Sequence, residues 1–118
     1  MNDWTIYHNP RCSKSRQTLQ LLEDNGIQPA VVLYLETPPT RAQLITLLQQ
    51  LKLSPRELLR KGEDEYKTLN LANPELEDDE LLDAMVAHPK LIERPIVVRG
   101  ERAVLGRPPE NALVLLKR

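Results

Sequence analysis

The chain has 118 residues, 41% of them apolar, a size that suits one domain with a single core. Sixteen Lys and Arg residues against seventeen Asp and Glu residues give a formal net charge of −1, and only 3% of the residues are aromatic. Neither a basic footprint nor stacking surfaces for nucleic acid are therefore indicated. The opening stretch Met1–Trp4 lacks a signal-peptide pattern and no apolar run approaches a membrane span, so we expect a cytoplasmic protein.

The cysteine and histidine content excludes several kinds of site. Cys12 is the only cysteine, and His8 and His88 are the only histidines. An internal disulfide is impossible, and we expect no metal site because the histidines are too few and too scattered for a zinc cage. The four glycines are isolated, which excludes a Walker loop and a GxGxxG dinucleotide turn, so we expect no bound cofactor. If Cys12 reacts, its resolving thiol must come from another molecule.

The first third of the chain reads as strand, helix, strand. Trp4–Tyr7 is short, β-branched and aromatic, which favours a strand that His8-Asn9-Pro10 ends. An amphipathic helix is predicted from Lys14 to a left-handed cap at Asn25-Gly26. The continuous apolar run Ala30–Leu35 predicts a buried parallel strand.

The middle of the chain is predicted to be helical. Thr40 and Gln43 form a capping box for one helix, and Ser54-Pro55 opens another. Two further helices are expected over Glu65–Leu71 and Asp78–His88. The expected inward-facing residues of the first and last of these helices are Leu44, Leu47, Leu48 and Leu51, and Leu81, Leu82, Met85 and Val86.

The last third returns to strands. Ile96–Val98 and Ala103–Leu105 predict a β-hairpin, and Pro108-Pro109 opens a final helix that carries Leu113 and Leu116. The order is β-α-β, a helical insertion at about 40–90, then β-β-α. This order predicts a single α/β domain over 1–118, with a thioredoxin-like fold and a mixed sheet.

Cys12 is the most informative residue because it lies where the first strand gives way to the first helix. Unpaired backbone N–H groups and about half a positive charge at a helix N-terminus stabilise a thiolate and bind an oxyanion. A lone cysteine is ordinarily inert core filling, but cysteines at helix N-termini have pKa values of roughly 3.5–7.5. We therefore expect Cys12 to be reactive.

Thiolate formation alone does not make an efficient catalyst. A fall in pKa from about 8.5 to about 6.5 raises the thiolate fraction at neutral pH about 25-fold but lowers nucleophilicity about 6- to 10-fold. Most of the rate must come from holding an anionic substrate against the sulfur, which needs fixed cations. Arg60, Arg94 and Arg107 are candidates, although their spacing alone favours solvated surface residues over anion ligands.

Other charged residues have simpler interpretations. His8 precedes Cys12 by four residues and either lends it a charge or hydrogen bond, or binds a backbone group at the strand end. His88 suits the last turn of its helix, and the acidic run Glu75–Asp83 suits a helix start rather than a metal site. Cys12-x3-Arg16 also differs from the Cys-x5-Arg loop of tyrosine phosphatases, which disfavours that class.

Several separated motifs occur in order along the chain. They are His8-Asn9-Pro10-x-Cys12-x-x-Ser15-Arg16, Leu33-Tyr34-Leu35-Glu36-x-Pro38-Pro39, Leu58-Leu59-Arg60-Lys61, His88-Pro89-x-Leu91-Ile92-x-Arg94-Pro95-Ile96-Val97-Val98 and Arg107-Pro108. Together they resemble the glutaredoxin-dependent arsenate reductase (ArsC) family over nearly the whole chain, from about Thr5 to Leu116.

The resemblance implies a thioredoxin-like fold and reduction of arsenate to arsenite. It implies that Cys12 attacks arsenic, that glutathione acts as co-substrate, and that glutaredoxin reduces the mixed intermediate. The implied anion-binding residues are Arg60, Arg94 and Arg107. It further implies that His8 and Ser15 tune the thiolate and that the peptide bond before Pro95 is cis.

Two other functions compete with this reading. A glutathione-dependent reductase of another disulfide or oxidised substrate would use the same thiolate without needing Arg94 and Arg107. Related Spx-type proteins bind RNA polymerase and use a Cys-x-x-Cys redox switch, but the second position here is Ser15. A lone thiol cannot form that switch.

Overall fold

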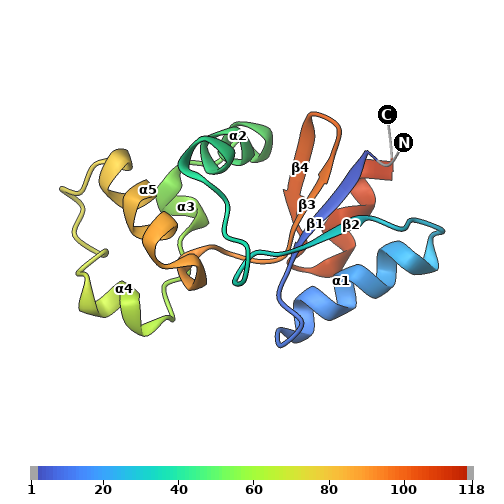
Figure 1. Cartoon of the computed structure of the whole chain (residues 1–118), viewed down its shortest axis with the longest axis horizontal. Coiled ribbons are helices and arrows are strands. Elements are labelled where there is room, and N and C mark those ends of the chain that lie inside the picture. Colours follow the sequence, from blue (N-terminus) through green and yellow to red (C-terminus); the bar gives the residue numbers. More distant parts are fainter. Residues whose placement is uncertain (1–2, 117–118) are drawn as a thin grey trace. The chain divides into compact units, whose positions relative to one another are not determined.

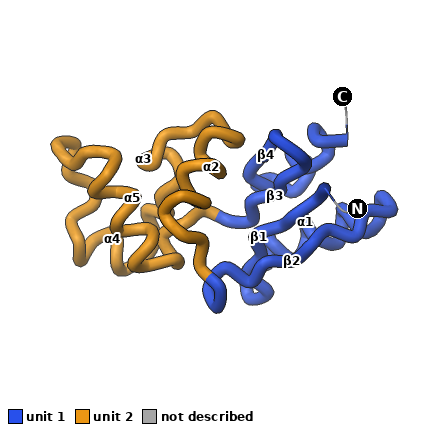
Figure 2. The backbone as a smooth tube through the Cα atoms, turned by 45° about the horizontal axis from the view of Figure 1, so that its top comes forward, with its two compact units in different colours: residues 1–37, 94–118 blue, residues 38–93 orange. Residues whose placement is uncertain are grey.

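The computed structural model describes residues 3–116, so Met1 and Asn2 of the stretch inspected for a signal lie outside the described residues. The chain divides into two compact units, coloured separately in Figure 2. Unit 1 comprises residues 1–37 and 94–118, and unit 2 comprises residues 38–93. Unit 2 coincides with the expected helical insertion, and the expectation that both units fold as one domain stays a prediction.

Unit 1 contains a mixed sheet with the strand order β2-β1-β3-β4 (Figure 1). β1 (Trp4–His8) pairs in parallel with β2 (Ala30–Leu33) and antiparallel with β3 (Ile96–Arg99). β3 in turn pairs antiparallel with β4 (Arg102–Leu105), which completes the predicted hairpin. The predicted α/β class, thioredoxin-like fold and mixed sheet are confirmed.

Two helical segments give unit 1 its core. α1 (Ser13–Asp24) lies beside η2, a 3₁₀ helix over Pro109–Leu116, and both contact the sheet (Figure 1). Each fully buried aliphatic side chain there contributes about 1.5–3 kcal/mol to stability. The core comprises Trp4, Ile6, Leu22, Val97, Ala112 and Leu115.

Two expectations about unit 1 are wrong in detail. β2 is an edge strand with Val31 46% exposed, because the expected buried strand pairs with β1 on one side only. The last helix buries Ala112 and Leu115, whereas Leu116 is exposed and Leu113 is half-buried. This shift follows from the three-residue period of a 3₁₀ helix, which places different side chains on one face than an α-helix does.

Unit 2 is helical, as predicted. Thr40 and Ser54 cap their helices through complete capping boxes with Gln43 and Glu57. α4 is shorter than the expected helix and ends before Leu71, which is buried in the following turn. The elements of unit 2 are α2 (Arg41–Leu51), α3 (Pro55–Leu58), α4 (Asp64–Thr68), α5 (Asp78–Ala87) and the 3₁₀ helix η1 (Pro89–Leu91).

The helices of unit 2 are joined by buried leucines and by surface charges. Arg41 on α2 forms ion pairs with Asp79 and Asp83 on α5. Each of these exposed pairs contributes little, because solvent screens them. The buried residues on α2 are Leu44, Leu47 and Leu48, and those on α5 are Leu81, Leu82 and Met85. Across residues 3–116, none of the helices combines the length and apolarity that crossing a bilayer requires.

Candidate active site

Cys12 lies at the N-terminal end of α1, where the predicted strand-to-helix junction places it. Its own N–H donates to the Asn9 carbonyl oxygen at 3.0 Å, and its carbonyl oxygen accepts from the Arg16 N–H at 3.0 Å. The first bond closes a tight turn after β1, and the second begins the helix. With extended backbone angles at the N-cap, Cys12 presents a half-buried side chain at the positive end of α1.

The surroundings of Cys12 favour the thiolate. Burial raises the pKa of the thiol, but donors at the sulfur outweigh that effect and hold its pKa below the ordinary value. These donors are the Ser15 backbone N–H, the Arg94 side chain and the Lys14 backbone N–H, supplemented by the positive charge of Arg94. Two of the donors are unpaired amides of the first helical turn, as the helix-terminus argument predicts.

Two of the three candidate arginines meet at this sulfur. Arg107 Nη1 lies 3.8 Å from Cys12 Sγ and donates to the Arg94 carbonyl oxygen at 3.4 Å. Arg94 lies directly before β3 and Arg107 shortly after β4, so the hairpin returns both guanidinium groups to Cys12. The Arg94–Pro95 peptide bond is cis, as expected, and Arg107–Pro108 is also cis, which the sequence did not indicate.

A close contact ties these two segments to α1. Gly106 donates from its N–H to the Pro95 carbonyl oxygen at 2.9 Å. A Cβ atom at Gly106 would lie 2.7 Å from Thr18 Cγ2 and 2.8 Å from Pro95 Cγ, so only glycine fits without displacement. The absence of a side chain at Gly106 therefore lets the Arg107 segment approach the helix that carries Cys12.

His8 acts on the loop rather than directly on the sulfur. Its Nδ1 lies 2.6 Å from Ser15 Oγ, which also accepts from the Asn9 N–H at 3.0 Å. Burial and the positive charge of Arg16 lower the pKa of His8, which favours the neutral ring. The charge that the sequence suggested His8 would lend to Cys12 is thus disfavoured, and Ser15 contributes to the thiolate through its backbone N–H.

Arg60 belongs to unit 2 and is already paired there. Its Nη1 lies 3.0 Å from Glu93 Oε1, and its Nε lies 3.3 Å from Glu63 Oε2. The Arg60 side chain is 21% exposed. The structure brings Cys12, Arg94 and Arg107 together in unit 1, and it shows Arg60 as a half-buried arginine held by two carboxylates.

Two supporting residues escaped sequence reasoning. Asn9 is 6% exposed, and its Oδ1 accepts from the Arg11 N–H at 3.0 Å, which fixes the turn before Cys12. An Asn before a proline is a known turn signal, so this role was open to inference. Thr18 lies on the buried side of α1 and has no local pattern that marks its bond to Gly106, 88 residues away.

The arrangement has the chemistry of a nucleophile beside an anion site. A thiolate, helix amides and two guanidinium groups can hold a tetrahedral oxyanion while the sulfur attacks its central atom. Within residues 3–116, no group of three or more His, Cys, Asp or Glu side chains is arranged to hold a metal ion.

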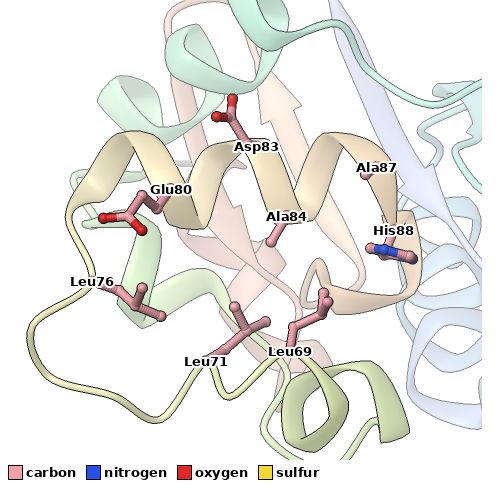
Figure 3. Close-up of a pocket in the computed structure, with 8 residues that line it drawn as sticks. All are labelled: Leu69, Leu71, Leu76, Glu80, Asp83, Ala84, Ala87 and His88. Carbon is pink, nitrogen blue, oxygen red and sulfur yellow. The ribbon is translucent and has the colours of Figure 1, made fainter.

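Unit 2 has a separate pocket of about 330 Å³, in which Leu69, Leu71 and Leu76 lie across from Ala84 of α5 (Figure 3). Glu80, Asp83, Ala87 and His88 complete its lining. These residues include neither a thiol nor a cation pair, so the pocket offers no counterpart to the Cys12 site.

Comparisons with known proteins relate the chain to one family. Residues 7–115 match the ArsC family. The chain is 58% identical to a protein of Escherichia coli K12 named Uncharacterized protein YfgD, over 112 aligned residues that make up 94% of each chain. It is 48% identical to an arsenate reductase of Escherichia coli over 98% of this chain and 82% of that one. A solved arsenate reductase from Vibrio cholerae has a TM-score of 0.92 and 55% identity, over 94% of this chain and 95% of that chain.

Proposed function

Since this chain belongs to the ArsC family, we propose that it reduces arsenate to arsenite with Cys12 as the nucleophile. The observation that carries the proposal is the meeting of Cys12 Sγ with Arg94 and with Arg107 Nη1, 3.8 Å away. A thiolate alone suits many reactions, whereas a thiolate beside two guanidinium groups suits an anionic substrate. Relatives at 48% and 49% identity are named arsenate reductases.

In the first step the Cys12 thiolate forms a sulfur–arsenic bond while one arsenate oxygen accepts protons and leaves as water. The helix amides and the guanidinium groups of Arg94 and Arg107 stabilise the remaining oxygens. Arg60, in unit 2, stays a predicted anion ligand that the family resemblance implies. An oxyanion bound by Arg60 would replace or share its pairing with Glu63 and Glu93.

The electrons come from outside the chain, because Cys12 is its only cysteine. Glutathione forms a second sulfur–arsenic bond as another oxygen leaves as water. A glutaredoxin thiol then attacks the glutathione sulfur, a disulfide forms, and the electron pair of the broken bond reduces As(V) to As(III). Water releases arsenite from Cys12. The cytoplasm, whose glutathione pool keeps thiols reduced, is the matching compartment.

The test is arsenate-dependent NADPH oxidation by the intact protein with glutathione, glutathione reductase and glutaredoxin, with thioredoxin and its reductase in a parallel arm. We expect turnover that Cys12→Ser abolishes. Arg107→Ala should lower kcat/KM for arsenate by about 10-fold or more, since a charge-assisted bond is lost. Lys67→Ala, an exposed cation of α4, is the matched control and should leave turnover unchanged.

Other outcomes separate the competing functions. An intact protein that shows no arsenate-dependent oxidation with either reductant would overturn the proposal. Reduction of a glutathione mixed disulfide that survives both Arg94→Ala and Arg107→Ala would favour a general glutathione-dependent reductase. Capture of RNA polymerase together with absent turnover would favour a regulator of the Spx type.

A further inference from the structure

Unit 1 has a pocket of its own, which lies against the turn that leads into Cys12. Its volume is about 390 Å³, within the range of about 300–1,000 Å³ typical of small-molecule sites. One wall comes from the turn after β1 and the other from the end of β2 and the turn that follows. The lining residues are His8, Asn9, Pro10, Arg11, Leu33, Leu35 and Glu36.

The pocket and the arginine pair are built from different strands. β2 and β3 pair with opposite edges of β1. The anion-binding arginines come from the ends of the β3–β4 hairpin, whereas the pocket uses the end of β2. An oxyanion on the β3 side thus leaves the β2 side of the turn available for a different molecule.

The pocket carries one charge of each sign. Arg11 and Glu36 are both exposed, and within residues 3–116 neither forms an ion pair. Both backbones are held in place: the Arg11 N–H donates to Asn9 Oδ1 at 3.0 Å, and the Glu36 N–H donates to the Leu33 carbonyl oxygen at 2.9 Å. Apolar surface from Leu33, Leu35 and Pro10 completes the walls.

We infer that this pocket binds the thiol co-substrate as a zwitterionic peptide of glutathione size, with Arg11 on a carboxylate and Glu36 on the ammonium group. A guanidinium group and a carboxylate in one pocket select a ligand that carries both charges. The adjacent turn keeps the bound thiol close to Cys12. The thiol then forms its bond to arsenic as a hydroxyl group of the Cys12-bound arsenic species takes up the thiol proton and leaves as water.

The inference rests on the proposed use of glutathione, so it is tested by binding and by kinetics. In the binding experiment, the intact protein is titrated with S-methylglutathione, which has both charges but no reactive thiol, and amide NMR shifts are recorded. We expect shifts confined to residues 8–12 and 33–36. Arg11→Glu and Glu36→Lys should each weaken binding about 10-fold or more. Arg11→Lys should retain most of it, and Glu23→Lys on the exposed face of α1 is the control.

In the kinetic experiment, Arg11→Glu and Glu36→Lys should raise KM for glutathione about 10-fold and leave KM for arsenate unchanged. Turnover supported by 2-mercaptoethanol, which has neither charge, should not respond to either variant. Shifts outside the pocket, or equal binding by native and variant proteins, would overturn the inference. If native turnover occurs with an unchanged glutathione KM in both variants, the pocket assignment fails and the proposed function stands. If S-methylglutathione binds in the pocket but the protein shows no arsenate turnover, the pocket assignment stands and the proposed function fails.

Discussion

Thr18 and Gly106 join the two parts of the candidate active site. Thr18 Oγ1 lies 3.0 Å from the Gly106 carbonyl oxygen and 2.8 Å from the Lys14 carbonyl oxygen, and the two acceptors share its single hydroxyl proton. The first bond connects the helix that begins after Cys12 to the residue before Arg107. Both partners are buried, so the bond is protected from water. The distance between the thiol and the Arg107 guanidinium group therefore depends on this contact.

Gly106→Ala should disturb that contact. The added methyl group would overlap Thr18 and Pro95, which costs about 1–3 kcal/mol of unfolding free energy. It should also displace Arg107 and slow any reaction that uses it. Urea denaturation measures the first effect. Gly62→Ala is the matched control, because a Cβ atom there meets no other atom within 4 Å. Equal stability of the two variants would contradict the steric argument.

The rate of iodoacetamide alkylation against pH should give a midpoint below the ordinary cysteine pKa. Burial raises the pKa of Cys12, but its hydrogen bonds and the Arg94 charge together lower it by more, so the thiolate persists to lower pH than in a free cysteine. Arg94→Ala should move the midpoint upward because a donor and a positive charge are lost. Sulfate, phosphate or arsenite should slow alkylation of the native protein. A midpoint like that of free cysteine, insensitive to these ions, would disprove the thiolate assignment.

Ser15→Ala should lower stability while sparing much of the reactivity of Cys12. Ser15 Oγ is hydrogen-bonded to the ring nitrogen Nδ1 of buried His8 and to the N–H of buried Asn9. Loss of these hydrogen bonds should lower the free energy of unfolding by about 1–3 kcal/mol. The Ser15 backbone N–H that favours the thiolate remains in the variant. Denaturation and alkylation rates measured together separate these roles, with the exposed Ser13→Ala as control. A stability loss no larger than that of Ser13→Ala would contradict the expectation.

His8 should make stability depend on pH below neutrality. Burial and then the Arg16 charge lower its folded-state pKa, so the unfolded chain binds the proton more tightly. The free energy of unfolding should fall as pH drops through the unfolded pKa of about 6.5, until pH passes the lower folded value. His8→Asn should remove this part of the pH dependence, which urea denaturation at several pH values measures. If the free energy of unfolding depends on pH in the same way for the native protein and for His8→Asn, this role of His8 is refuted.

Much of this architecture can be predicted from the sequence because it depends on local interactions. The capping boxes at Thr40 and Ser54 and the cap at Gly26 are short-range hydrogen-bonding patterns, and each forms as expected. The position of Cys12 at a helix N-terminus follows from the same reasoning. The burial of β2 and the inward face of η2 were misjudged, because both depend on what the rest of unit 1 packs against.

The sequence by itself determined the order of the elements and the lone thiol at a strand-to-helix junction, because adjacent residues and composition decide these features. Only the tertiary structure decided that Arg94 and Arg107 converge on Cys12, that Arg60 is held by Glu63 and Glu93, and that His8 is hydrogen-bonded to Ser15. The pairing of β1 with β3 and the close approach at Gly106 bring Arg94 and Arg107 to Cys12, which is more than eighty residues away in the sequence. Contacts of that range leave no periodic pattern in the chain.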